Sequence, residues 1–237
     1  MSKCHFPCKE KSKGSDTSPR GSSMALGLIE MSPHDSTVAA LEWDPASPHD
    51  AAEWFANVSV PWWIAGGWAI DLFLNRETRA HKDLDVGVLR RDVGAVLGSI
   101  QGWEVFEAKD RALTRLSHTT PRSDVNSLWC RKLGTQRWKV ELMLDEAEGD
   151  LLIYRRHPGV RRTLEGLVYQ SSDSIPYLAP EVQLLYKAKQ ARPQDELDFE
   201  AVVPNLSAEA RNWLYQSLVH TLPSHPWRHK LERHYVA

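Results

Sequence analysis

Cysteine, long hydrophobic runs and an excess of charge of one sign are all scarce in this sequence of 237 residues. Its three cysteines, Cys4, Cys8 and Cys130, are too few and odd in number for a disulfide framework, so we expect a protein of the reducing cytoplasm. No apolar run approaches the roughly 20 residues that span a bilayer, so we expect no membrane partner. The formal net charge is only -2. No overall basic field favours nucleic acid, and we do not expect it as a partner.

The N-terminal segment is rich in Ser, Lys, Gly and Pro. No apolar segment of the kind found in a secretory signal follows Lys3, Lys9, Lys11 and Lys13, so no such signal is expected. A segment of this composition buries little apolar surface. We therefore predict a disordered tail over residues 1–36.

Hydrophobic periodicity changes along the rest of the chain. The stretch WKVELMLDE alternates in the manner of a strand, whereas PEVQLLYKAKQA has helical spacing and begins with proline. Strands dominate the first part and helices the last, which predicts an α+β domain over 37–178 and a C-terminal helical domain over 179–237. Strands are expected at 62–66, 82–90, 103–108, 112–117, 127–133 and 138–146. Helices are expected at 36–57 or 49–57, and at 68–75, 91–102, 180–191, 192–206 and 207–222.

Two aspartates interrupt an apolar strand pattern at residues 82–90. Asp83 and Asp85 would point to the same face, with Cα atoms roughly 6.5–7 Å apart, so that their side chains converge on one divalent ion or bridge two. Glu141 lies opposite the apolar side chains of the strand predicted at 138–146. If the two strands are neighbours, three carboxylates meet, and hard oxygen ligands of this kind suit Mg²⁺. Two such ions would activate an attacking oxygen and stabilise a leaving phosphate.

A glycine pair, Gly66 and Gly67, joins a short apolar strand to the helix predicted at 68–75. Bare backbone N–H groups at the start of a helix form a site for phosphate. Either pattern alone is more often a simple turn or a solvated strand edge. A phosphate cradle followed at this spacing by two aspartates indicates a nucleoside triphosphate substrate, with pyrophosphate or phosphate as the leaving group.

Basic side chains near these motifs are further candidates for nucleotide binding. Arg79 and His81 precede the acidic pair and could reach phosphate, and the alternative for both is a charge pair or a loop hydrogen bond. Four arginines lie in YRRHPGVRR, residues 154–162. They form either a solvated face or an electropositive rim around the triphosphate.

Lys187, on the helix predicted at 180–191, could approach the phosphates if that helix closes the cleft, and a solvated lysine is the default alternative. Three acidic residues follow it: Asp195, Glu196 and Asp198. We expect them to cap a helix or to pair with nearby lysines rather than to hold a metal.

The combination GGWAID (66–71) followed by TRAHKDLDV (78–86) resembles the nucleotidyltransferase superfamily that includes DNA polymerase beta. Within it, the stretch is most similar to the branch of aminoglycoside 2″-nucleotidyltransferases and lincosamide nucleotidyltransferases. The resemblance implies a nucleotidyltransferase fold, with a small mixed sheet flanked by helices. It also implies Mg²⁺ as cofactor, with two ions, and transfer of a nucleoside monophosphate, usually AMP from ATP, to a hydroxyl.

The same resemblance implies roles for individual residues. Asp83 and Asp85 would hold the metals, and Gly66 and Gly67 the triphosphate. Glu141 matches the third carboxylate by its strand context and would be either a metal ligand or the base that takes the proton of the acceptor hydroxyl. No antibiotic-binding residue can be carried over, because nothing in the sequence matches an acceptor pocket.

Three functions follow from these patterns. The first is an enzyme that adenylylates a hydroxyl of a small molecule, such as an aminoglycoside-type antibiotic. The second keeps the chemistry but has a protein or tRNA acceptor, as in some toxin–antitoxin systems. The third is a non-catalytic nucleotide-binding relative, which would be expected to have lost an acidic residue. The acceptor, the preferred nucleotide and the oligomeric state cannot be read from the sequence.

Overall fold

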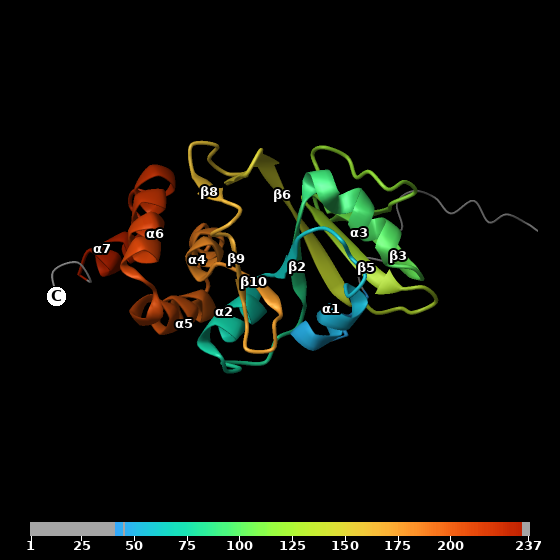
Figure 1. Ribbon diagram of the computed structural model, residues 1–237, viewed down its shortest axis with the longest axis horizontal. Helices are drawn as coiled ribbons and strands as arrows, with labels where there is room; N and C mark the ends of the chain where they lie inside the picture. The colour runs from blue at the N-terminus through green and yellow to red at the C-terminus, as the bar shows by residue number, and fades with distance from the viewer. Residues whose placement is uncertain (1–40, 45, 234–237) are drawn as a thin grey trace, which may run out of the picture. The chain divides into compact units, whose positions relative to one another are not determined.

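The computed structural model describes residues 41–44 and 46–233 (Figure 1), and the tail predicted for 1–36 lies outside them. The helices are α1 (Pro48–Trp54), α2 (Gly66–Leu74), η2 (Arg90–Asp92), α3 (Val93–Ser99), α4 (Pro180–Ala188), α5 (Pro193–Val202), η3 (Val203–Asn205), α6 (Ala208–Thr221) and α7 (Pro226–Arg233). The strands are β1 (Trp62–Ile64), β2 (Asp85–Leu89), β3 (Trp103–Lys109), β4 (Ala112–Arg115), β5 (Ser127–Lys132), β6 (Val140–Glu148), β7 (Leu151–Ile153), β8 (Arg161–Thr163), β9 (Val168–Gln170) and β10 (Pro176–Leu178).

The strands of the described residues form one mixed sheet of ten, in the order β4-β3-β5-β6-β2-β1-β10-β9, with β7 paired to β6 and β8 to β7. This confirms the predicted α+β class with a mixed sheet. The sheet contains more strands than the sequence indicated, because β7 to β10 have three residues each and are too short to show a clear alternation. At its centre β2 runs antiparallel to β1 and parallel to β6.

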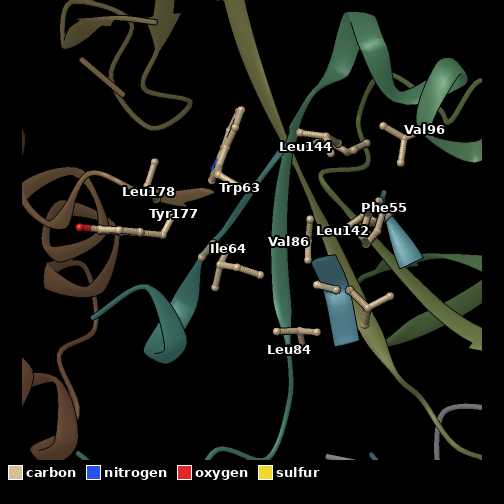
Figure 2. Close-up of a cluster of buried hydrophobic side chains, with 14 of the residues drawn as sticks. Phe55, Trp63, Ile64, Leu84, Val86, Val96, Leu142, Leu144, Tyr177 and Leu178 are labelled. Carbon is tan, nitrogen blue, oxygen red and sulfur yellow. The ribbon is translucent and has the colours of Figure 1, made fainter. Parts of the chain in front are cut away.

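The two faces of β2 and β6 have opposite chemical characters because successive side chains of a strand point to opposite faces. Val86 and Leu142 are paired in register and fully buried. Figure 2 shows these side chains beside Phe55, which follows α1, and Val96 of α3. The other face carries Asp85, whose Cα is paired with that of Glu141 in the parallel register of β2 and β6. The apolar core on one face therefore fixes the positions of the carboxylates on the other.

The start and end of α2 follow from its sequence. It begins at the glycine pair directly after β1, and it ends at Asn75, whose φ of 52° is the left-handed conformation that often ends a helix. Proline occupies the first position of both α4 and α5, where its missing N–H is not needed. No helix in the described part of the chain is long and apolar enough to cross a bilayer.

A second apolar cluster holds α2 and the C-terminal helices together. Ile70 of α2 is fully buried in it with Leu184 of α4, Phe199 of α5, Leu214 of α6 and Trp227 of α7. Figure 1 shows α4 to α7 grouped beyond β10 and β9, with α1 and α3 beside the other part of the sheet. The described residues all belong to one compact unit. The boundary between a strand-rich and a helical domain at residue 179 stays a prediction, based on the change in element type.

Candidate functional site

A cavity of about 810 Å³ opens above the carboxylate face of the sheet. Residues far apart in the sequence line it, from the start of α2, the loop before β2, the first half of β6 and the end of α4. All the residues singled out above as catalytic or nucleotide-binding are among them: Gly66, Gly67, Arg79, Asp83, Asp85, Glu141 and Lys187. The structure thus brings the sequence motifs into one site, although their individual roles stay predictions.

The carboxylates of this site come from two neighbouring strands and one loop. Asp85 is the first residue of β2 and is paired in register with Glu141 of β6. Ser127 Oγ donates a hydrogen bond to Glu141 Oε1 over 2.7 Å. Asp83 lies in the loop before β2 and is exposed, so the expectation that it shares a strand with Asp85 is wrong. The strand begins later than predicted, and the loop leaves Asp83 a wider range of directions.

The carboxylates repel one another when they are ionised. Burial raises the pKa of Asp85 well above its usual range, and the charges of Glu141 and Asp83 raise it further. Burial also raises the pKa of Glu141, partly offset by the hydrogen bond from Ser127. A divalent cation would remove this repulsion, and an all-oxygen donor set is the kind that Mg²⁺ prefers. The side chains present therefore fit a magnesium ion chemically.

Their spacing still requires a side-chain movement to close around an ion. Within residues 41–44 and 46–233, no three His, Cys, Asp or Glu side chains are placed to hold a metal ion together. Asp83 is the exposed member of the set, and a change of its rotamer alters its distance to the other two. Metal ligation by Asp83, Asp85 and Glu141 is therefore a proposal rather than an observed geometry.

The glycine pair allows close packing against the start of β2 and the loop before it. Gly66 has a φ of +67°, and a Cβ there would overlap Asp85 Oδ2. The Gly66 N–H already donates to Gln183 Oε1 over 2.8 Å, so it is not the bare group that the sequence predicted. No described residue accepts a hydrogen bond from the Gly67 N–H. Gly67 is thus the member of the pair whose N–H is available to phosphate.

Replacing Gly67 by alanine tests this cradle. A Cβ at Gly67 would overlap Arg79 Nη2 and the ring of His81, so both side chains must shift away from the phosphate position. We expect Gly67→Ala to weaken Mg²⁺-ATP binding about 10-fold, as measured by calorimetry. Gly98→Ala is the matched control, because a Cβ on that helical glycine meets no atom within 4 Å. Equal affinities in Gly67→Ala and wild type would mean that the pair is only a turn.

A buried network that the sequence did not single out holds Arg79 against the cavity. His81 Nε2 lies 2.6 Å from Asp71 Oδ2, and Thr78 Oγ1 donates to Asp71 Oδ1 over 2.5 Å. Arg79 Nη1 lies 3.2 Å from His81 Nδ1. Burial alone would raise the pKa of Asp71, but the hydrogen bonds from His81 and Thr78 outweigh it, and this pKa is below its usual value. The sequence singled out Arg79 and His81, with a loop hydrogen bond as one alternative, and the only signal for Asp71 was its charge inside the apolar helix WAIDLFL.

This network determines which nitrogen of His81 carries the proton. An ionised Asp71 can only accept, so His81 Nε2 must be the donor. The Nδ1 lone pair of a neutral ring is then directed at Arg79, which can only donate. The imidazole also packs against Trp68, with ring centroids 4.2 Å apart and the ring planes tilted by 32°. Asp71 and His81 therefore orient the side chain of Arg79, which lines the cavity and whose Nη2 lies 3.8 Å from Asp198 Oδ2.

The change Asp71→Asn should disrupt this alignment while keeping the shape of the side chain. An amide can donate to Nε2 and favour the form of His81 that carries its proton on Nδ1. That N–H would then face the N–H groups of Arg79, which can only donate. We expect the KM for ATP to rise about 10-fold with a smaller change in kcat, and the ¹⁵N chemical shifts of His81 to report the exchanged tautomer. Thr78→Val is the control, since it removes a bond to Asp71 without touching the ring. An unchanged tautomer in Asp71→Asn would contradict the assignment.

Lys187 lines the cavity but is engaged by two buried carboxylates. Its Nζ lies 2.8 Å from Asp195 Oδ1 and 2.9 Å from Asp198 Oδ2, and only 7% of its side chain is exposed. Arg192 Nε donates to Asp195 Oδ2 over 2.9 Å. Burial alone would raise the pKa of Asp195, but the bonds from Arg192 and Lys187 outweigh it and hold that pKa far below its usual range. These contacts agree with the expectation that the acidic cluster pairs with lysine.

The arginine run at 154–162 divides into two pairs with different surroundings. Arg155 and Arg156 line the cavity. Arg161 pairs with Glu148 over 3.0 Å, and Arg162 with the buried Glu181 over 2.6 Å. Half of the run is thus an electropositive rim and half is structural. Further lining residues that the sequence did not indicate as part of the site include Gln183, Tyr186, Arg192 and Gln194.

Comparison with known proteins gives one family and several similar structures. Residues 49–202 match the family model described as aminoglycoside-2″-adenylyltransferase. The crystal structure of ANT(2″)-Ia in complex with adenylyl-2″-tobramycin is similar at 16% identity and a TM-score of 0.50, over 73% of this chain and 95% of that one. The lincomycin-bound lincosamide adenylyltransferase LnuA is similar at 15% identity and a TM-score of 0.47, over 68% and 97%. No curated protein matches the sequence. At such identities the structural likeness concerns the fold alone.

Proposed function

Because the chain belongs to the aminoglycoside-2″-adenylyltransferase family and is a nucleotidyltransferase, we propose that it transfers AMP from ATP to a hydroxyl group of a small molecule in a Mg²⁺-dependent reaction. The observation that carries this proposal is the single cavity lined by the glycine pair, the three carboxylates and several cations. An aminoglycoside-type antibiotic is the first acceptor to test, because of the description of the family.

The proposed reaction forms one bond and breaks another at the α-phosphorus of ATP. The acceptor oxygen attacks it, the bond to the bridging oxygen breaks, and pyrophosphate leaves with the electron pair. Asp83, Asp85 and Glu141 would hold Mg²⁺, which when bound neutralises charge on the triphosphate and lowers the pKa of the attacking hydroxyl. The proton of that hydroxyl passes to a base. Glu141 would take this proton if it is the base rather than a ligand of the ion, in which case Asp83 and Asp85 would hold Mg²⁺ without it.

The remaining side chains bind and orient the nucleotide. The Gly67 N–H and the start of α2 offer a site for phosphate oxygens. Arg79, aimed by the ring of His81, adds a planar cation on the same side. Lys187 would contribute its charge at a distance, because Asp195 and Asp198 already hold its ammonium group. We therefore assign the larger part of triphosphate binding to Gly67 and Arg79.

The direct test incubates the purified protein with each labelled nucleoside triphosphate, Mg²⁺ and a panel of aminoglycosides and lincosamides. Pyrophosphate release and product mass are the two measurements. We expect ATP to bind in a Mg²⁺-dependent way and to give a product heavier by one adenylyl group. If no triphosphate binds in the presence of Mg²⁺, the proposed function is wrong whatever the acceptor is.

A further inference from the structure

We propose that Trp129 of β5 forms the acceptor side of this site: its ring supports a saturated ring of the acceptor, and its indole N–H orients Glu141. The inference rests on the proposed nucleotidyl transfer and adds a specificity-determining residue to the same site. The acceptor it selects is a cyclic molecule, with a face of C–H groups that can stack and with hydroxyl or amino groups at its edge.

The order of the strands places the proposed reaction along one line across the sheet. The central strands lie in the order β5-β6-β2-β1. The phosphate cradle follows β1, Asp85 begins β2, and Glu141 lies on β6. In an in-line displacement the leaving and attacking oxygens lie on opposite sides of the phosphorus. With pyrophosphate at the cradle, the acceptor oxygen is on the side of Glu141, and the rest of the acceptor extends over β5.

Trp129 is the residue of β5 that lies beside Glu141 on this face. Their Cα atoms are paired in the antiparallel register, and the side chains of such a pair share one face, with Cβ atoms about 4.5–5.5 Å apart. Burial raises the pKa of Glu141, and hydrogen bonds from Ser127 and from the indole of Trp129 oppose this shift. Two neutral donors of β5 therefore hold Glu141, and Trp129 is a positioning residue for it.

Neighbouring aromatic side chains fix the orientation of the Trp129 ring. Trp43 packs edge-to-face against it with ring centroids 5.2 Å apart, and Trp138 does so at 5.5 Å. Trp138 is fully buried and packs in turn against Phe106, with centroids 5.3 Å apart. Trp129 itself is only half-buried, so part of its side chain stays open on a rigid support. A surface fixed in this way loses little conformational entropy when a ligand binds.

An indole suits a saturated ring that carries hydroxyl or amino groups. Its large apolar surface can cover the C–H groups on one face of such a ring, and its π-system attracts ammonium groups. The edge of the ligand ring, with its hydroxyl groups, then faces Glu141. A linear polyamine carries the charge but has no such face, so stacking on Trp129 would favour a cyclic acceptor over a linear one.

The test follows the indole Nε1–H resonances of Trp129 and Trp213 in protein saturated with Mg²⁺ and the non-hydrolysable ATP analogue AMPcPP. Tobramycin, the linear polyamine spermidine and a single-stranded RNA oligonucleotide are titrated separately. We expect tobramycin to shift the Trp129 signal and spermidine to leave it unchanged. Trp213, whose indole donates to the backbone oxygen of Arg161 over 3.1 Å, lies outside the cavity lining and should not respond.

Three results of these titrations would overturn the inference. The first is tobramycin that does not bind to the AMPcPP complex, or that binds without shifting Trp129. The second is an equal shift with spermidine, which would mean that charge and not a ring is recognised. The third is a larger shift with the RNA oligonucleotide, because nucleic-acid bases also stack on aromatic side chains.

Two substitutions separate the ring of Trp129 from its N–H. Trp129→Phe keeps an aromatic face but removes the donor, so kcat should fall about 10-fold while the affinity of the AMPcPP complex for tobramycin stays nearly unchanged. Trp129→Leu also removes the face, so tobramycin affinity should fall at least about 10-fold. AMPcPP affinity should equal that of wild type in both variants, because the phosphate cradle lies on the far side of β2.

Phe106→Leu is the matched control for loosening of the aromatic cluster. Phe106 is buried in the same cluster and pairs with Trp129 from β3, on the side away from Glu141. It should lower the melting temperature without changing tobramycin affinity. An equal loss of tobramycin affinity in Phe106→Leu and Trp129→Leu would make Trp129 a structural residue only. Failure of the wild type to bind AMPcPP with Mg²⁺ would instead contradict the proposed function itself.

Discussion

Asp85→Asn is expected to lower the transfer rate by about 10³-fold or more and, at the same time, to raise the melting temperature of the metal-free protein. The rate should fall because an amide is a poor replacement for a carboxylate as a ligand of Mg²⁺. The stability should rise because Asp85 is half-buried beside Glu141, and its charge is unfavourable in the absence of a cation. Initial rates of pyrophosphate release and thermal unfolding in chelator measure the two effects.

The pH dependence gives this prediction a further check. Since the folded-state pKa values of Asp85 and Glu141 are raised, the folded protein binds more protons than the unfolded chain above the usual carboxyl range near about pH 4. The free energy of unfolding of the metal-free wild type should therefore decrease as the pH rises from the usual carboxyl pKa to the raised pKa values of the folded protein. Asp85→Asn should make this decrease with pH smaller. Asp92→Asn, on η2 outside the cavity, is the control and should change neither rate nor slope. Undiminished transfer in Asp85→Asn would contradict the metal assignment, and a marked fall in melting temperature would make the carboxylate structural.

The substitution Lys187→Met should destabilise the protein by about 3–5 kcal/mol, the usual consequence of removing one partner from a buried ion pair. Lys187 has only 7% of its side chain exposed, and its partners Asp195 and Asp198 have 2% and 4%. Methionine fills similar space but leaves the two carboxylates with less compensation. Urea unfolding, with the midpoint and the slope fitted together, measures the change.

Lys189→Met is the matched control for this effect. Lys189 also lines the cavity, but it is exposed and lies two residues further along the chain, so its loss should change stability by no more than about 0.5 kcal/mol. If Lys187→Met were as stable as wild type but bound ATP much more weakly, Lys187 would be a phosphate ligand first and a structural residue second.

The sequence by itself determined the class of fold and the family. Alternating and helical periodicities depend on neighbours a few residues away, so β6, α2 and α4 could be predicted to within a few residues. The order of a glycine pair, a helix and two aspartates is equally local, and it was sufficient for the family resemblance that the match over residues 49–202 confirms. The net charge and the cysteine content added only the expectations of a reducing compartment and of no nucleic-acid partner.

Only the tertiary structure decided how the individual groups are used. The Gly66 N–H is taken by Gln183, which lies 117 positions away, and Arg156 rather than Arg161 reaches the cavity because β7 and β8 turn the chain between them. The Asp71–His81–Arg79 alignment likewise depends on where the loop before β2 crosses the start of α2. The hydrophobic periodicity of a segment predicts which side of its own helix or strand a residue occupies. It does not predict which distant element packs against that side, and this packing decides whether a charge is paired, buried or left to bind a ligand.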